Sequence, residues 1–497
     1  MVERPSKLFI ARRRFPCAMV RHKHTSSLQP AYANMTHSAL PRQLSSTLQT
    51  APRSGQLARS VVAAVLATGF AGATAQAQSL SALFEAARDF DATFQSARSA
   101  QDAAAAKAEQ ARAGLLPTVG LGAGFSRSNV DNASPVPNRS FDARNATVSA
   151  SQPLYRPANR LAFEQGQKSL ALAQAQLKAA EQDLIIRTSQ AYFDVLAAQD
   201  TLAYVKAQKA AVSEQLAAAK RNFEVGTSTV TDSREAQARF DLVVAQEIAA
   251  ENDLHVKSLA LDTLVGKTKV QPLPLGLPVA LPSTMPDDVN HWVNLAETTH
   301  PSVVQAQTAL DIASLELKKA EAGHGPTVDL TGQYALAKAP SNTTGLPLRS
   351  NTATVGVQFN MPLFAGYAIQ NRVKEALALE EKARTDAEGA KRAVAQATRT
   401  AFFGIQSGKG QVKALEAAEA SSQSALDANK LGYQVGVRIN IDVLNAQSQL
   451  FQTKRDLAVA RYNVLMGSLR LRQASGSLAA DNLNDINALL STSAATR

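Results

Sequence analysis

Four segments of the chain alternate apolar with polar residues at a period of two. In the first of them, for example, Val119 and Leu121 flank Gly120. The four segments are 118–126, 145–151, 327–336 and 353–360. An alternation of about ten residues is typical of a tilted strand that crosses a membrane with one apolar face. The pattern predicts two strand hairpins, 118–152 and 327–361; an ordinary surface hairpin packed on helices is the alternative.

The stretches between these hairpins have the composition of long helices. Residues 167–225 contain neither Gly nor Pro, so their 59 residues can form a helix of roughly 88 Å. No proline follows Pro362, which allows a comparable helix from about 367 to 432. Stripes of Ala in both stretches allow close packing of neighbouring helices. A plain coiled coil is the alternative interpretation, and the strands weaken it.

Each long helix is expected to end at a tight turn and to be followed by a returning helix. The turns contain the pairs Val225-Gly226 and Val435-Gly436. An aspartate follows each turn, Asp232 in the first and Asp442 in the second. We expect these carboxylates to cap the returning helices by accepting bonds from their free N–H groups. The sequence thus predicts two helical hairpins, 158–266 and 366–476.

The two halves of the chain repeat each other at an offset of 209 or 210 residues. Short runs that recur at this offset are 116–119 with 325–328, 152–155 with 361–364, and 223–226 with 433–436. Such repetition indicates two copies of one structural unit. We expect a first repeat at 78–286 that ends in a Pro-rich link, 271–286. A second repeat at 287–477 and a C-terminal tail at 478–497 complete the chain.

The basic charge of the chain is concentrated in its first 77 residues. The formal net charge is +11, but residues 1–77 hold ten Lys or Arg and one acid, which leaves 42 bases against 40 acids elsewhere. This distribution argues against nucleic-acid binding. Arg53 and Arg59 precede an apolar run, 61–70, and small residues up to Ala77, so 1–77 is predicted to be a signal peptide with an extended n-region. A membrane anchor is the alternative, but the run is shorter than the ~20 residues of a bilayer span.

The sequence shows no catalytic or metal-binding pattern. Its only cysteine, Cys17, lies in the leader, so the mature chain has no thiol ligand and no disulfide. The four histidines beyond the leader lack metal-ligand spacing, and no hydrolase or zinc-protease motif occurs. The glycine-rich run from Gly120 to Gly124 resembles a phosphate loop but lies inside an alternating strand. We therefore expect no enzyme, no cofactor and no metal site.

Four strands cannot cross a membrane by themselves, because every backbone N–H and C=O must be paired in hydrocarbon. A dimer would supply eight strands and a barrel filled by side chains, whereas a trimer supplies twelve and an open pore. We therefore expect an α+β membrane protein. Its predicted form is a trimeric twelve-strand outer-membrane β-barrel, four strands per chain, continued by a long α-helical barrel in the periplasm.

The residues around the helical turns carry a further resemblance. The runs concerned are Phe223-Glu-Val-Gly226 with Asp232 and Ala236-Gln237, the segment 432–447, and 460–463 followed by Gly476. They resemble the TolC-like family of outer-membrane efflux and secretion channels, over roughly residues 78–477. The resemblance implies a homotrimer in outer-membrane lipid with a twelve-helix periplasmic tunnel, closed at rest. It also implies two partners, a periplasmic adaptor and an inner-membrane transporter of ABC or RND type.

The resemblance further implies a periplasmic gate at the second turn. Gating residues of the family correspond to Tyr433 and Arg438, which would bond to Thr231 and Asp232 of the neighbouring hairpin. Asp442 corresponds to a ring of pore-facing carboxylates. A simple helix cap is the alternative role for Asp232 and Asp442, and a solvated loop charge the alternative for Arg438.

Two features of the turns qualify or extend this gate. The position of a second acidic ring holds Asn445, so strong cation block at the entrance is not expected. The turn residues form exposed tips that an adaptor can grip. These tip residues are Val225, Gly226, Val435 and Gly436.

The predicted function is that of the outer-membrane channel of a tripartite export system. The missing lipidation cysteine and the motif from Arg438 to Gln447 favour type I protein secretion over multidrug or metal efflux. A periplasmic adaptor is the alternative of a different class, since adaptors also contain helical hairpins. Adaptors lack the 210-residue duplication and the four paired strands.

Overall fold

The computed structural model describes residues 78–131, 138–276, 281–282, 285–340 and 347–490. The predicted signal peptide, 1–77, lies outside the described residues. The middle of each strand-hairpin loop, parts of the predicted link 271–286 and the end of the predicted tail 478–497 also lie outside them. No helix in the described ranges combines the length and the apolarity that a bilayer span requires.

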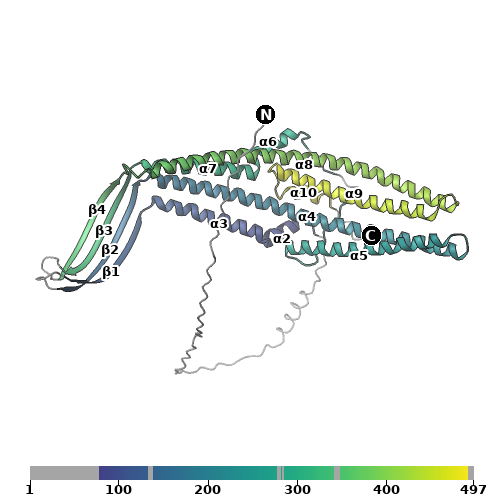
Figure 1. The fold of residues 1–497 in the computed structure, drawn as a ribbon, viewed down its shortest axis with the longest axis horizontal. Coiled ribbons are helices and arrows are strands. Elements are labelled where there is room, and N and C mark those ends of the chain that lie inside the picture. The colour runs from purple at the N-terminus through teal and green to yellow at the C-terminus, as the bar shows by residue number, and fades with distance from the viewer. Residues whose placement is uncertain (1–77, 132–137, 277–280, 283–284, 341–346, 491–497) are drawn as a thin grey trace, which may run out of the picture. The chain divides into compact units, whose positions relative to one another are not determined.

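Each half of the chain runs through helices, a strand hairpin and a helical hairpin (Figure 1). The first half contains α2 (Leu80–Phe90), α3 (Ala92–Arg112), the short 3-10 helix η1 (Ala113–Leu115), β1 (Thr118–Val130), β2 (Arg139–Tyr155), α4 (Pro157–Glu224) and α5 (Val230–Val265). The second contains α6 (Val289–Thr299), α7 (Pro301–Glu321), η2 (Ala322–His324), β3 (Thr327–Pro340), β4 (Pro347–Asn360), α8 (Ala368–Gln434), α9 (Asn440–Ala474) and α10 (Asn482–Asn487).

The four strands form one antiparallel sheet in the order β1-β2-β3-β4. Its register places Leu121 opposite Val148, Val148 opposite Tyr334, and Tyr334 opposite Ala353. Directly paired residues lie on the same face of a sheet, so the apolar positions of all four strands form one continuous face. That face is bare in the single chain, with Val355 80% exposed. The other face carries mainly Gly, Ser and Thr.

The long helices make two antiparallel hairpins, α4 with α5 and α8 with α9 (Figure 1). Helix α4 has 68 residues and α8 has 67, so each extends for roughly 100 Å. Their turns lie at the end of the helices opposite the sheet (Figure 1). Few of the side chains along helices of this length can be buried by one partner helix, which leaves much of α8 exposed.

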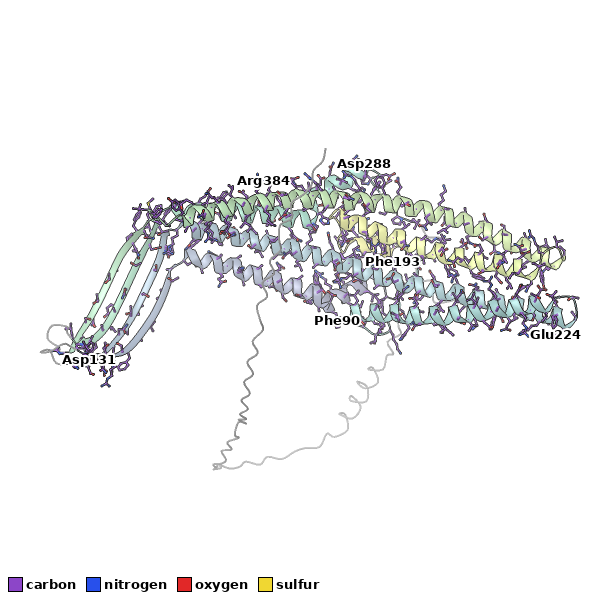
Figure 2. All side chains as sticks on the ribbon, viewed as in Figure 1. Phe90, Asp131, Phe193, Glu224, Asp288 and Arg384 are labelled. Atoms are coloured by element: carbon purple, nitrogen blue, oxygen red, sulfur yellow. The ribbon has the colours of Figure 1, made fainter. Side chains whose placement is uncertain are left out.

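The largest buried cluster lies about midway along the helices, near Phe193 (Figure 2). It joins α2, α4, α9 and α10, through side chains such as Phe84, Phe193, Leu465 and Leu483. The Tyr192 hydroxyl donates to the carbonyl of Leu273 at 3.0 Å, which ties the segment after α5 to the same place. The described parts of the link and the tail therefore pack against the middle of the helices.

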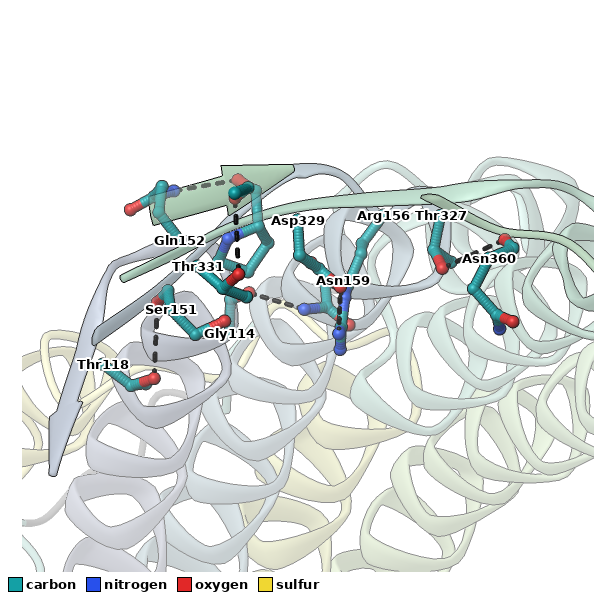
Figure 3. A network of polar contacts seen from close by, with 12 residues as sticks. Gly114, Thr118, Ser151, Gln152, Arg156, Asn159, Thr327, Asp329, Thr331 and Asn360 are labelled. Carbon is teal, nitrogen blue, oxygen red and sulfur yellow. Dashed lines mark hydrogen bonds and ion pairs between the residues drawn. The ribbon is translucent and has the colours of Figure 1, made fainter. Parts of the chain in front are cut away.

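Polar contacts join the sheet to the helices (Figure 3). Arg156, just before α4, donates through Nε to Oδ1 of Asp329 on β3 at 2.7 Å and through Nη2 to Oδ2. The Asp329 side chain is buried, so this two-point ion pair supplies the partner that its carboxylate requires. The Gln152 amide donates to the carbonyl of Leu115 at 3.0 Å. These bonds connect β2 to η1 and β3 to the segment that leads into α4.

Candidate functional site at the helical turns

The two turns have nearly the same backbone. In the first, Gly226 has φ +77°, and the N–H of Thr227 donates to the carbonyl of Asn222 at 2.8 Å. In the second, Gly436 has φ +79°, and the N–H of Val437 donates to the carbonyl of Gly432 at 2.8 Å. A positive φ is strained for any residue with a Cβ, so both turns need glycine at this position. The preceding valines, at 225 and 435, are exposed at the tips.

The first returning helix begins with a complete capping box. Thr229 is the N-cap of α5, and its hydroxyl accepts from the N–H of Asp232 at 3.2 Å. In return, Oδ2 of Asp232 accepts from the N–H of Thr229 at 3.2 Å and from the Ser228 hydroxyl at 2.6 Å. Asp232 therefore serves the cap from the third helical position, with Thr229 as the N-cap itself.

These bonds also set the electrostatics of Asp232. The hydrogen bond from the Ser228 hydroxyl favours the carboxylate and lowers the pKa of Asp232, against a smaller opposite effect of burial. All of the bonds that the Asp232 carboxylate accepts within the described chain use Oδ2. Oδ1 therefore keeps its capacity to accept a bond from another chain.

The second returning helix begins without a side-chain cap. Its N-cap is Ile439, which has no polar side chain. The prediction that the Asp442 carboxylate caps α9 is therefore wrong: Asp442 lies in the first turn and faces Arg438 instead. Its Oδ2 is 3.7 Å from Nη1 of Arg438, and the two side chains are 34% and 58% exposed, respectively. An ion pair this exposed is weak.

Within one chain, polar bonds connect the two turns. The Asn222 amide donates to the Tyr433 hydroxyl at 3.2 Å, and the Asn440 amide donates to the backbone carbonyl of Asp232 at 3.4 Å. Further along the helices, Arg239 donates to Oδ1 of Asn445 at 2.8 Å. Asn445, which occupies the position of the second acidic ring, thus accepts a hydrogen bond from the cationic Arg239.

The structure places the predicted gate residues close together but pairs them differently inside the chain. Tyr433 bonds to Asn222, and Arg438 faces Asp442. Thr231 is exposed on the first turn. The bonds of Tyr433 and Arg438 to Thr231 and Asp232 of a neighbouring hairpin stay a prediction, which concerns contacts between chains.

The sequence analysis missed three positions that shape this site. Asn222 and Asn440 connect the turns, and Asn440 is only 1% exposed. Gly432 lies under Arg438: a Cβ built at Gly432 would be 2.7 Å from Cγ of Arg438. The repeat could have revealed Asn222 and Gly432. The offset of 210 aligns these two residues, which marks a position where the two turns differ.

The turns contain no catalytic arrangement. No cluster of three or more His, Asp, Glu or Cys residues suited to a metal ion occurs within the described ranges. The arrangement allows Arg438 to exchange one carboxylate partner for another. Arg438 is exposed and its ion pair with Asp442 is weak, so it can bond to Asp442 in its own chain or to the unused Oδ1 of Asp232 in another chain. Such an exchange is the physical basis of a gate.

Comparison with protein families gives one match over most of the chain. The outer membrane efflux protein family matches residues 83–267 and 292–477. Outer membrane protein TolC of Vibrio cholerae is 33% identical over 426 residues, which are 85% of this chain and 96% of that protein. The proteases secretion protein PrtF of Dickeya chrysanthemi is 29% identical, over 84% of this chain and 93% of that protein.

Solved structures share the fold at lower identity. The outer membrane protein VceC of Vibrio cholerae superposes with a TM-score of 0.70 at 20% identity, over 80% of this chain and 96% of that one. The CmeC outer membrane channel of Campylobacter jejuni gives a TM-score of 0.70 at 17% identity, over 83% and 90%. At these identities the likeness concerns the fold.

Proposed function

Because this chain belongs to the outer membrane efflux protein family, we propose that it is the outer-membrane channel of a protein-secretion system. Its membership makes it an export channel of the outer membrane with a periplasmic tunnel, and not an enzyme. The predicted TolC-like family and the predicted α+β fold are confirmed, and the alternative of a periplasmic adaptor is rejected.

The proposed pore is a trimer. Channels of this family are trimeric and work with adaptors and inner-membrane transporters. In this chain, the observation that carries the proposal is the continuous apolar face of a four-strand sheet whose edges, β1 and β4, are unpaired in the described chain. Pairing β4 of one copy with β1 of the next closes a sheet of twelve strands and leaves no edge in lipid.

A charge placed on each face of β4 tests this pore. Val355→Arg puts a cation into lipid, which costs about 2–4 kcal/mol near the middle of the bilayer, whereas Thr354→Arg keeps its cation in the wet lumen. We expect trimer yield in outer-membrane fractions to fall for Val355→Arg only. Equal loss for Thr354→Arg would contradict the assignment of the faces.

The gate and the tips are proposed to work between chains of the trimer. Arg438 would leave Asp442 and bond to the unused Oδ1 of Asp232 on the neighbouring chain, with Tyr433 reaching Thr231. Asp442 would contribute to a carboxylate ring at the constriction. The exposed tips, formed by the Val-Gly pairs at 225–226 and 435–436, would contact the adaptor.

The repeat boundaries are likewise proposed, with 78–286 and 287–477 as the two units, 1–77 as a signal peptide and 478–497 as a tail. Each of the two ranges matched by the family lies inside one of these units. The link 271–286 would join them.

Secretion is favoured over efflux because two relatives bear secretion names. PrtF and the alkaline protease secretion protein AprF of Pseudomonas aeruginosa are each 29% identical to this chain. Multidrug or metal efflux is the second candidate, favoured by the outer membrane efflux protein BepC of Brucella suis at 28% identity.

A tagged copy, cross-linked in cells and purified, separates these candidates. We expect an adaptor together with an ABC-type transporter, and loss of a secreted protein from the medium when the gene is deleted. Recovery of an RND-type transporter, with raised drug sensitivity and normal protein secretion, would make efflux the function.

A further inference from the structure

Three basic side chains form a row across the sheet near its loop end. Arg144 on β2 is paired with Lys338 on β3, and Lys338 is paired with Arg349 on β4. All three are exposed. Directly paired residues have Cβ atoms about 4.5–5.5 Å apart on one face, so the three cations are immediate neighbours. They line a shallow pocket of about 390 Å³.

The row lies on the apolar face of the sheet, which turns toward lipid in the proposed trimer. Successive residues of a strand alternate between faces, so Lys338 shares its face with Leu336 and Tyr334. On β1, the residue paired with Arg144 is Phe125, and the Arg144 guanidinium lies 5.6 Å from the centre of its ring. The row thus lies at the loop end of the apolar face.

The height of the row matches the outer limit of a membrane. Phe359, an exposed aromatic residue at the helix end of the same face, lies ten positions after Arg349 on β4. Ten residues span ~33 Å along a strand. A strand tilt of about 40° reduces this to ~25 Å, the height of the apolar band of an outer-membrane barrel. The cations therefore lie where lipid headgroups begin.

The protein does not neutralise these cations. Among the described residues, no carboxylate lies within ion-pair distance of Arg144, Lys338 or Arg349; nearby Asp142 lies 3.9 Å from Nε of Arg127 instead. The loop sequences 132–137 and 341–346 contain no acidic residue. Like charges that are direct neighbours in a sheet repel one another. A row of three is therefore stabilised by an anion from outside the chain.

The helix end of the sheet is built differently. Its exposed side chains include aromatic residues, namely Tyr155 at the end of β2 and the edge-to-face pair of Phe364 and Tyr367 after β4. The cation next to Tyr155, Arg156, is already paired with Asp329. Aromatic side chains are favoured at membrane–water interfaces in general, whereas a row of free cations is favoured at a membrane surface that carries anionic lipid. The two ends of the sheet therefore fit two different leaflets.

We propose that Arg144, Lys338 and Arg349 bind the phosphate groups of an anionic glycolipid in the outer leaflet of the outer membrane. The planar guanidinium groups of the two arginines match the oxygen geometry of phosphate. The inference rests on the proposed trimer and its orientation, in which three copies give nine such cations around the barrel. Phe125, which is paired with Arg144 on β1, extends the row and would lie beside the lipid.

The test uses the purified full-length trimer in non-ionic detergent. Binding of lipid A with both phosphates, and of the same lipid after removal of both, is measured by native mass spectrometry and by the shift in melting temperature. The variants are the triple Arg144→Gln, Lys338→Gln, Arg349→Gln and the single Lys338→Gln. Arg139→Gln is the matched control, because Arg139 is exposed at the same end and lies on the opposite face, paired with Val130.

We expect wild type and Arg139→Gln to bind phosphorylated lipid A and to ignore the dephosphorylated form. Each cation near an anionic surface contributes roughly fivefold, so the triple variant should bind on the order of 100-fold more weakly. Equal binding by the triple variant overturns the proposal. Equally tight binding of phosphatidylglycerol or inorganic phosphate by wild type overturns the glycolipid as occupant.

The same samples distinguish this inference from the proposed function. Trimer mass and single-channel conductance are recorded for every variant. A conducting trimer that binds no glycolipid refutes the lipid site alone, whereas a preparation without trimers refutes the proposed pore. If the triple variant does not assemble, the single Lys338→Gln still has to show a roughly fivefold loss.

Discussion

The two helical turns share a backbone but differ in their side chains. At an offset of 210, Ser228 aligns with Arg438 and Thr229 with Ile439. In the first turn, both hydroxyls bond to Asp232 and hold it in a capping box. In the second turn, the equivalent positions supply a cation and an apolar side chain, so no capping box forms.

This difference shows how a duplicated unit can separate structure from movement. The first turn uses its carboxylate to stabilise its own helix start. The second leaves Asp442 in a weak, exposed contact with Arg438, which costs little to break. We infer that the first turn is the fixed part of the entrance and the second is the part that changes partners.

The largest expected effect comes from removing the exchangeable groups of the second turn. Tyr433→Phe with Arg438→Ser deletes one phenolic hydroxyl and one guanidinium in each of three chains. Six contacts of about 0.5 kcal/mol each sum to ~3 kcal/mol over a trimer, or on the order of 100-fold in the ratio of closed to open states. We expect higher conductance in planar bilayers and greater uptake of large antibiotics by cells.

A substitution in the first turn serves as the control for this double variant. Ser228→Ala should leave conductance near the wild-type value, because Ser228 serves only the capping box in this chain. Unchanged conductance of the Tyr433/Arg438 double variant, with its trimer confirmed, would show that these residues do not keep the entrance closed.

The next effect concerns the stability of the two helix starts, and its expected sign is opposite at the two turns. Thr229→Ala removes the N-cap of α5 and should destabilise that helix start by about 1 kcal/mol. Ile439→Thr supplies a missing N-cap to α9 and should stabilise its start by up to about 1 kcal/mol. Hydrogen exchange of the amides just after each turn measures both. Faster exchange after Ile439→Thr would contradict the proposed difference.

Features of the fold and of the turns could be predicted from the sequence where they depend on residues that are close together in the chain. The strand alternation was readable because a membrane imposes a period of two on residues such as Leu121 and Val355. The turns were readable because a positive φ requires glycine at 226 and 436. Both signals are local, and each is carried by a few neighbouring residues.

The contacts between the hairpins were not readable in this way. The bonds from Asn222 to Tyr433 and from Arg239 to Asn445 join residues more than 200 positions apart. Asn and Gln are common on exposed helix faces, so their type alone does not reveal a partner. The cap of α9 was wrongly assigned to Asp442 because a helix start was placed by residue type, whereas α9 begins at Asn440 behind an apolar Ile439.

A smaller effect is expected where the second turn makes room for its arginine. A methyl group at Gly432 would lie 2.7 Å from Cγ of Arg438, so Gly432→Ala must displace that side chain. Alanine normally stabilises a helix interior relative to glycine by about 1 kcal/mol, and here the displacement offsets that gain. We expect a modest rise in open probability in planar bilayers, below that of the double variant. Gly410→Ala, elsewhere in α8 and with nothing within 4 Å of the added methyl group in this chain, serves as the control.

The smallest expected effect is a pH dependence that belongs to the first turn alone. The Ser228 hydroxyl lowers the pKa of Asp232, so the carboxylate form is favoured in the folded turn. A group with a lowered pKa contributes its stability above its unfolded pKa, about 3.9 for Asp, and loses it as pH falls through the lowered value. We therefore expect hydrogen exchange after the first turn, corrected for its intrinsic rate, to accelerate below about pH 4. The carboxylate is only partly buried, so the acceleration should be slight. Asp232→Asn should abolish it, while Asp442→Asn should leave it unchanged because Asp442 takes no part in that capping box. An equal response of both variants would mean that the titration arises elsewhere and that the two turns do not differ in this respect.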